Sequence, residues 1–265
     1  MSAATFHDAA SRSVRVPVVL QRLALALIIL AVWWLVSLTV QPYVLPRPDR
    51  VFARILQLSQ TGDMPVNILT TLGRVCAGFA IAVAIGVPVG ILLGSHRGLG
   101  SFFEPVLPVL NTVSSAIWAI FAIIWFGLSA MTPIFVVLMT AFPLIVTNVW
   151  QGTQAVNADY VELAQALRLS RAKTLTKIYL PSILPYFFSG ARLAFGFGWR
   201  VSLVAETLGS SSGVGYRLKQ ASDLIQMDQV FAWTIVQVAM MLAIEIGLLQ
   251  PLERHLFRWR RDVRS

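Results

Sequence analysis

The chain has 265 residues, of which 57% are hydrophobic and 12% are charged, and its net charge at pH 7 is +9. A soluble globular domain carries about 25% charged residues, so this composition excludes a water-soluble core and indicates an integral membrane protein. Basic loops that orient membrane spans account for the positive charge, and we predict no nucleic-acid partner.

The N-terminal region resembles a secretory signal in that Arg12, Arg15 and Arg22 precede an apolar run. Residues 23–40 carry no charge, which makes the run long enough to cross a membrane and longer than a usual signal-peptide core. No small-residue cleavage site follows it before Pro42. We therefore predict a retained first span, preceded by a cytoplasmic segment at residues 1–19.

Apolar windows of about 20 residues mark membrane helices, because the hydrocarbon layer is about 30 Å thick. The sequence predicts an all-α polytopic membrane protein with one domain, residues 1–265, and about six transmembrane helices. The predicted spans are 20–40, 66–94, 105–127, 131–152, 182–208 and 230–250. The third mixes prolines with polar side chains, a composition tolerated against protein or water but not against lipid.

Orientation follows from the lysines and arginines in the loops. Six spans would place both termini on one side, and most loop cations fall on that side. The other side holds the smaller set, Arg47, Arg50, Arg54, Arg217 and Lys219. Cytoplasmic loops carry the excess of positive charge, so we predict cytoplasmic termini, including a basic tail at residues 251–265. Residues 44–58 are then extracytoplasmic, with Pro46 and Pro48 leading into a short amphipathic helix.

Residues 153–181 form a basic segment between two apolar runs and are predicted to be cytoplasmic. Asp159 and Glu162 have the spacing of a capping box, which predicts a helix start. One apolar face follows, formed by Tyr160, Leu163, Ala164 and Leu167. A second short helix is predicted over residues 171–179, ended by Pro181 because proline lacks a backbone donor.

The two short helices are marginal on their own, because isolated helices under about 12–15 residues rarely hold in water. Their apolar faces need a cover. Either they pack on the cytoplasmic ends of the spans, or a partner protein supplies a groove. The sequence leaves both alternatives open.

Five ionisable residues fall inside the predicted spans, and each costs about 2.5–3.5 kcal/mol at a helix centre facing lipid. They are Arg74, Arg192, Arg200, Glu206 and Glu245. We expect each to face protein or water. For Arg200 and Glu206 two roles stay open, namely a place in a translocation pathway or a structural ion pair.

Other residues within the spans suggest a gate, a packing face and a buried thiol. The gate candidates are Asn111, Ser114, Ser115, Trp118 and Trp125. The glycines at 78, 86, 90 and 94 are spaced by four or eight and predict a close helix–helix contact. The single cysteine, Cys76, excludes an internal disulfide and is interpreted as a small packed apolar residue. The three histidines, at 7, 96 and 255, are scattered and predict no metal site.

The segment "ELAQALR", followed by "LP" at residues 180–181, resembles the EAA loop of ABC importer permeases. Glu162, Ala164, Leu180 and Pro181 match that pattern, whereas Arg168 stands where the family has glycine. Segments in the same order resemble the nitrate, sulfonate and taurine branch: "VLPRPDRVF", "TLGRVCAGFAIAVAIGVPVGILLGSHR", "WFGLSAMTPIFVVLMTAFPLIVTNVWQG", "AETLGSSSGVGY" and "LERHLFRWR".

The resemblance implies a type I importer permease (MetI-like) fold in the inner membrane, and a coupling loop that docks on a cytoplasmic ATPase. The implied coupling residues are Glu162, Leu163, Ala164, Leu167, Arg168, Ser170 and Arg171. It further implies a homodimer with two ATPase subunits, which bind ATP and Mg²⁺, and an extracytoplasmic solute-binding protein. The chain itself has no GxxxxGK[ST] phosphate loop, so we predict a non-catalytic subunit without a cofactor.

Arg168 bears on the loop geometry, because a non-glycine residue in a left-handed turn costs about 1–2 kcal/mol. Either the turn is made differently, with Ser170 capping the second helix, or the partner absorbs the strain.

Three other classes of protein fit the sequence less well. An ion-coupled secondary transporter usually shows inverted repeats, and none is evident. An intramembrane enzyme would show motifs such as HExxH or GxSxG, and neither occurs. A receptor or scaffold gives no reason for the basic loop. The substrate stays open among oxyanions, sulfonates, taurine-like acids, aromatic acids and pyrimidine precursors.

Overall fold

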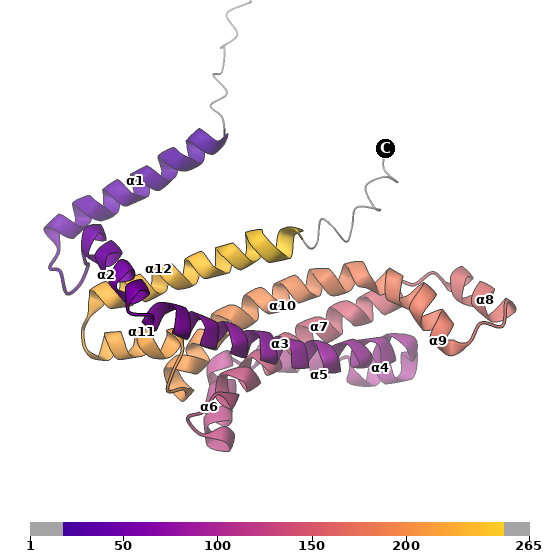
Figure 1. Ribbon diagram of the computed structural model, residues 1–265. Coiled ribbons are helices and arrows are strands. Elements are labelled where there is room, and N and C mark those ends of the chain that lie inside the picture. Colours follow the sequence, from indigo (N-terminus) through magenta and orange to yellow (C-terminus); the bar gives the residue numbers. More distant parts are fainter. Residues whose placement is uncertain (1–17, 252–265) are drawn as a thin grey trace, which may run out of the picture.

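The computed structural model describes residues 18–251, and this part of the chain contains helices and no strand (Figure 1), which confirms the predicted all-α fold. The α-helices are α1 (Val18–Thr39), α2 (Pro48–Gln60), α3 (Asp63–Ser95), α4 (Arg97–Phe103), α5 (Val106–Thr112), α6 (Ser115–Phe126), α7 (Met131–Gln154), α8 (Ala158–Ala166), α9 (Arg171–Thr174), α10 (Leu180–Gly209), α11 (Val214–Asp223) and α12 (Met227–Ile244). Two π-helical turns complete the set, η1 (Leu175–Tyr179) and η2 (Glu245–Leu249). The predicted segments at residues 1–19 and 251–265 lie almost wholly outside the described residues.

The centre of the molecule is a layer in which α7 lies between α3 and α10 (Figure 1). Along the α3–α7 seam, Gly78, Gly86, Gly90 and Gly94 all face α7. A Cβ atom added at Gly90 would lie 2.7 Å from the Cβ atom of Val149, closer than van der Waals contact allows. The predicted glycine face is thus confirmed as a close helix–helix contact, since side chains there would push the backbones apart.

Four helices are long and apolar enough to cross a membrane, at residues 20–39, 63–95, 131–154 and 227–247. They coincide with four of the predicted spans. The predicted span 182–208 lies inside α10, whose 30 residues are also long enough to cross, at about 1.5 Å per residue. By composition α10 does not belong with the four, because it carries glycines, serines and charged residues.

The third predicted span, 105–127, is wrong as a single helix. Its residues form α5 and α6, and the combined segment bends by 90° at the break. Val113 and Ser114 are extended there, with ψ angles of 120° and 142°. The Oγ atom of Ser114 accepts a hydrogen bond from the Ala116 N–H, so Ser114 caps α6 and starts a new helix direction. Within residues 18–251, the number of spans by length and apolarity is therefore four, or five if this bent pair forms one span.

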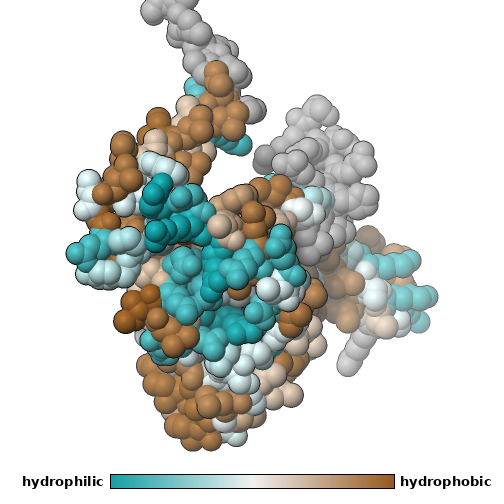
Figure 2. Space-filling model, turned by 60° about the vertical axis from the view of Figure 1, so that its left-hand side comes forward, coloured by the Kyte–Doolittle hydropathy of each residue, from teal (hydrophilic) through white to brown (hydrophobic). Residues whose placement is uncertain are grey.

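One end of the molecule is polar and is built by α2, α11 and the start of α12, and hydrophilic residues gather on this face in Figure 2. The predicted amphipathic helix after Pro46 is confirmed as α2, which buries Val51 and Leu58 against Trp233 of α12. Arg217 on α11 pairs with Asp63 of α3 at 2.8 Å. The helices α8 and α9 lie at the opposite end (Figure 1).

Two details of the loop helices differ from prediction. Helix α8 is capped by Asn157, whose Oδ1 atom accepts from the Asp159 N–H at 2.9 Å. The predicted capping box is wrong, because Asp159 already lies within the first turn. Pro181 does not end the second helix, since η1 continues directly into α10. The wider π turn, in which the Leu180 N–H donates to the Leu175 carbonyl, accommodates the missing proline donor.

The side chain of Cys76 is exposed on α3. The prediction of a packed apolar residue is wrong there, because the side of α3 that packs on α7 is the one that carries the glycines.

Candidate functional site

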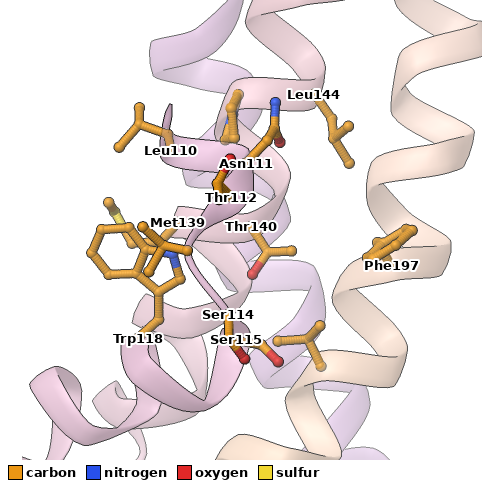
Figure 3. A pocket seen from close by; sticks show the side chains of 13 residues that line it. Leu110, Asn111, Thr112, Ser114, Ser115, Trp118, Met139, Thr140, Leu144 and Phe197 are labelled. Atoms are coloured by element: carbon orange, nitrogen blue, oxygen red, sulfur yellow. The ribbon is translucent and has the colours of Figure 1, made fainter. Parts of the chain in front are cut away.

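A cavity of about 440 Å³ lies where the α5–α6 bend meets α7 and α10. Four of the predicted gate residues, Asn111, Ser114, Ser115 and Trp118, line it together. Figure 3 shows them with Thr140 of α7 and Phe197 of α10. The other lining residues are Leu110, Thr112, Val113, Met139, Pro143, Leu144 and Val201.

The cavity is lined mainly by apolar side chains, with a cluster of uncharged polar ones among them and no charged residue. Several hydroxyl donors are used locally: that of Thr140 bonds to the Val136 carbonyl at 2.7 Å, and that of Thr112 to the Pro108 carbonyl at 2.9 Å. Their lone pairs and the amide of Asn111 supply weak polar contacts. A transport pathway needs contacts of this strength, because a solute must enter the site and also leave it.

Sequence reasoning did not identify the wall contributed by α7 and α10. Thr140 and Pro143 interrupt the apolar run of α7, three residues apart, and this was the available signal. Phe197 gave none, because an aromatic residue in an apolar helix is unremarkable in sequence.

Trp125 lies apart from this cavity, at the end of α6, where its side chain is exposed. Its ring stacks on Phe121 at 5.8 Å and meets Phe135 edge-on at 5.5 Å. The structure thus separates Trp125 from the four other gate candidates.

Glu206 is fully buried and forms an ion pair with Arg74 of α3, with 2.8 Å between Nη1 and Oε1. Its carboxylate also accepts hydrogen bonds from the Thr71 hydroxyl at 2.8 Å and the Gly215 N–H at 3.0 Å. Arg74 also donates to the Ser212 carbonyl at 2.7 Å. This network joins α3, the end of α10 and the start of α11, away from the cavity, and it matches the structural alternative for Glu206.

The other predicted charges in the spans separate into one pair and one single residue. Arg192 of α10 donates through Nε to Glu245 of η2 at 2.8 Å. Arg200 is exposed on α10, and within residues 18–251 it makes no ion pair or hydrogen bond. Its position lies between Phe197 and Val201 in the chain, both of which line the cavity.

The predicted coupling residues gather at the α8–α9 end. Ala164 is 2% exposed, whereas Leu163 and Leu167 are 56% and 63% exposed. A shallow groove of about 290 Å³ lies between α8 and the start of α10, and Tyr160, Leu169 and Ile178 help to line it. Glu162, Arg168 and Ser170 are exposed. Arg171 begins α9.

The turn between α8 and α9 is left-handed at Arg168, where φ is 50°. The Leu169 N–H bonds to the Ala164 carbonyl at 2.9 Å, which is the 6→1 bond of a Schellman motif. Ser170 Oγ accepts from the Lys173 N–H at 3.4 Å. The chain therefore keeps the left-handed turn that favours glycine, with arginine in it, so the alternative of a differently made turn is wrong, although Ser170 does cap the next helix.

No group of three His, Cys, Asp or Glu side chains is arranged to hold a metal ion within residues 18–251. The two sites are thus a cavity with uncharged polar groups beside a helix bend and an exposed apolar helix at one end of the molecule.

Comparison with known proteins gives the same picture. Residues 86–251 match the family described as binding-protein-dependent transport system inner membrane component. The putative aliphatic sulfonates transport permease protein SsuC of Bacillus subtilis is 30% identical, over 90% of this chain and 87% of its own. The taurine transport system permease protein TauC of Escherichia coli is 27% identical, over 89% and 88%. The bicarbonate transport system permease protein CmpB of Synechococcus elongatus is 35% identical, over 59% of each chain.

Among solved structures, a chain of the MetNI methionine ABC transporter in an inward-facing conformation has the same fold. The TM-score is 0.65 at 15% identity, covering 75% of this chain and 98% of that one. The predicted MetI-like fold is confirmed. The family match argues against the three alternatives, namely a secondary transporter, an intramembrane enzyme and a scaffold. The chain belongs to the family of binding-protein-dependent transport system inner membrane components, and is a permease subunit of an ABC importer.

Proposed function

We propose that this chain pairs with a second copy to form the translocation pathway for a small polar or anionic solute, driven by two ATPase subunits that dock on α8 and α9. In this arrangement ATP and Mg²⁺ bind to the ATPases, and an extracytoplasmic binding protein delivers the solute at the α2–α11 end. Both termini and the α8–α9 segment are then cytoplasmic.

The observation that carries the proposal is the exposed apolar face of α8. Tyr160 and Leu163 on α8 and Leu167 directly after it are each more than half exposed, at the end of the molecule. Because these side chains are already partly covered, burying the rest of each in a partner is worth about 1–2 kcal/mol. Packing on the spans, the other alternative open from the sequence, accounts for Ala164 and leaves these three uncovered.

The geometry of the loop fits a mechanical linkage. The 6→1 bond and the Ser170 cap stabilise the turn between α8 and α9, and α9 continues through η1 into α10 without a break. Helix α10 in turn carries part of the cavity wall. A displacement of α8 by an ATPase would therefore reach the cavity along one continuous run of helix.

The test is co-purification of the ATPase subunit with a Leu163→Asp variant of the membrane-inserted chain. A charge in the centre of a docked apolar face removes a binding hot spot, and we expect ATPase retention to fall about tenfold or more. Leu224→Asp is the matched control, because Leu224 is equally exposed, at 61%, and follows α11 at the opposite end.

Undiminished retention by Leu163→Asp would show that α8 is not the docking helix. A second measurement addresses the energy source: the chain reconstituted alone in vesicles should accumulate no solute. Sustained uphill uptake without the ATPase would contradict the proposed division of labour.

A further inference from the structure

Arg200 stands out as an exposed cation in the middle of a helix of 30 residues. The other arginines inside α3 and α10 have carboxylate partners, since Arg74 pairs with Glu206 and Arg192 with Glu245. Within residues 18–251 no such partner reaches Arg200.

A lipid-facing position does not fit this residue. An arginine at the centre of a spanning helix costs at least about 2.5 kcal/mol in lipid, so such side chains face a bundle interior or a water-filled cavity. Snorkelling, which lowers that cost near helix ends, is limited here because Arg200 lies more than two turns from either end of α10.

The face that carries Arg200 is the one turned away from the core. Leu193, Phe197, Val204 and Leu208 recur with Arg200 every three or four positions and are 38% to 57% exposed. The opposite side of α10 is buried against α3 and α7. Phe197 and the neighbouring Val201 border the cavity, so the Arg200 face is continuous with the cavity wall.

We infer that Arg200 faces the aqueous pathway between two copies of this chain and gives it a positive potential that selects anionic solutes. The inference rests on the proposed translocation role of the cavity and adds the charge of the solute to it. The cavity lining itself carries no charge, and in a two-fold assembly Arg200 contributes one cation from each copy.

The size of the effect follows from Coulomb's law. A unit charge about 6–10 Å away changes the local concentration of a monovalent ion about two- to threefold in water, raising it for an anion and lowering it for a cation. Two such charges, acting with opposite sign on an anion and a cation, shift the anion-to-cation preference by about 15- to 100-fold, and screening at physiological ionic strength reduces this to about tenfold or less. Each arginine also repels the other, and an anion between them relieves that repulsion.

The test measures this potential directly, in the reconstituted complex with its ATPase. Cys76 is the only cysteine of the chain, so Cys76→Ser gives a thiol-free background. A cysteine placed by Val204→Cys, one turn from Arg200 on the same face, is modified with anionic methanethiosulfonate ethylsulfonate and with the cationic trimethylammonium reagent. Leu224→Cys provides the reference reactivity of an exposed thiol away from Arg200.

With Arg200 present, we expect the anionic reagent to be favoured at Val204→Cys relative to the reference. Arg200→Gln should lower the anion-to-cation rate ratio about tenfold, and Arg200→Lys should retain it. If Arg200→Gln reduces the yield of complex, the second neutral variant is Arg200→Cys in the thiol-free background. The same two reagents are then applied to the thiol at position 200.

Two results would overturn the inference. One is a Val204→Cys thiol that neither reagent modifies, because the face would then not line water. The other is a rate ratio that does not respond to the charge at position 200. Neither readout uses ATP hydrolysis or docking on α8, so a failure of ATPase docking is recognised separately, by the co-purification experiment.

Discussion

Arg74 and Glu206 form an ion pair in which both side chains are almost completely buried, with 2.8 Å between Nη1 and Oε1. The pair connects α3 to the end of α10. The carboxylate is further held by Thr71 and by the Gly215 N–H. Because these groups come from three elements, α3, α10 and α11, the pair fixes the polar end of the molecule.

Glu206→Gln is expected to destabilise the chain strongly, because it keeps the shape of the side chain and leaves the Arg74 cation without its counter-charge. Breaking a buried pair from one side costs about 3–5 kcal/mol, which lowers the melting temperature by about 10 °C in a chain of this size. Thermal unfolding in detergent measures this change in melting temperature.

The control for that experiment is Thr71→Ser, which retains the hydroxyl that donates to Glu206 and accepts from the Val214 N–H at 2.9 Å. Its melting temperature should stay close to that of the unsubstituted chain. Equal losses for both variants would mean that packing around position 71, and not the charge pair, dominates.

The seam between α3 and α7 gives a second prediction, through Gly90→Ala. The new Cβ atom would lie 2.7 Å from Val149 Cβ and 3.0 Å from the Val146 carbonyl. The helices must move apart, at a cost of about 1–3 kcal/mol. In contrast, Gly73→Ala on the same helix meets nothing within 4 Å and should be neutral or stabilising by up to about 1 kcal/mol. Comparison of the two melting temperatures checks the seam, and a loss at Gly73 as large as at Gly90 would contradict it.

The pair Arg192–Glu245 ties α10 to η2 and gives a third prediction. Glu245→Arg places two cations together and should lower the yield of inserted protein and its melting temperature. The exchange Arg192→Glu with Glu245→Arg restores opposite charges and should recover most of the loss, because the side chains are partly exposed and free to adjust. No recovery in the double variant would show that the partners do not act as a pair.

Much of the fold was predictable because apolar runs and glycine spacing act locally. The spans 66–94 and 131–152 and the glycine face all follow from patterns within one helix. The pairing of Arg74 with Glu206 was not predictable, because the two residues are 132 positions apart and each charge fitted several partners. The sequence left Glu206 open between pathway and ion pair for the same reason.

One wall of the candidate cavity was predictable from the sequence, and the other was not. Asn111, Ser114 and Ser115 showed a polar break in an apolar run, which is a local signal. The 90° bend that turns them towards α7 depends on the extended backbone at Val113 and Ser114. The second wall, with Thr140 and Phe197, depends on packing between separate helices, which no single segment encodes.

Arg168 gives the last prediction, because it holds a left-handed conformation, with φ of 50°, in a turn where glycine carries no steric penalty. Arg168→Gly should therefore stabilise the turn by about 1 kcal/mol. Amide hydrogen exchange at Leu169, whose N–H closes the turn onto Ala164, should slow about fivefold, since 1.4 kcal/mol corresponds to tenfold. Lys173→Gly is the matched control, as it replaces an exposed cation within α9 by glycine. Glycine at that position lowers the stability of α9 by about 1 kcal/mol, so amide exchange within α9 should become faster. If Arg168→Gly also speeds exchange at Leu169, the turn is not left-handed in solution, and the arginine contributes through its side chain instead of through its backbone conformation.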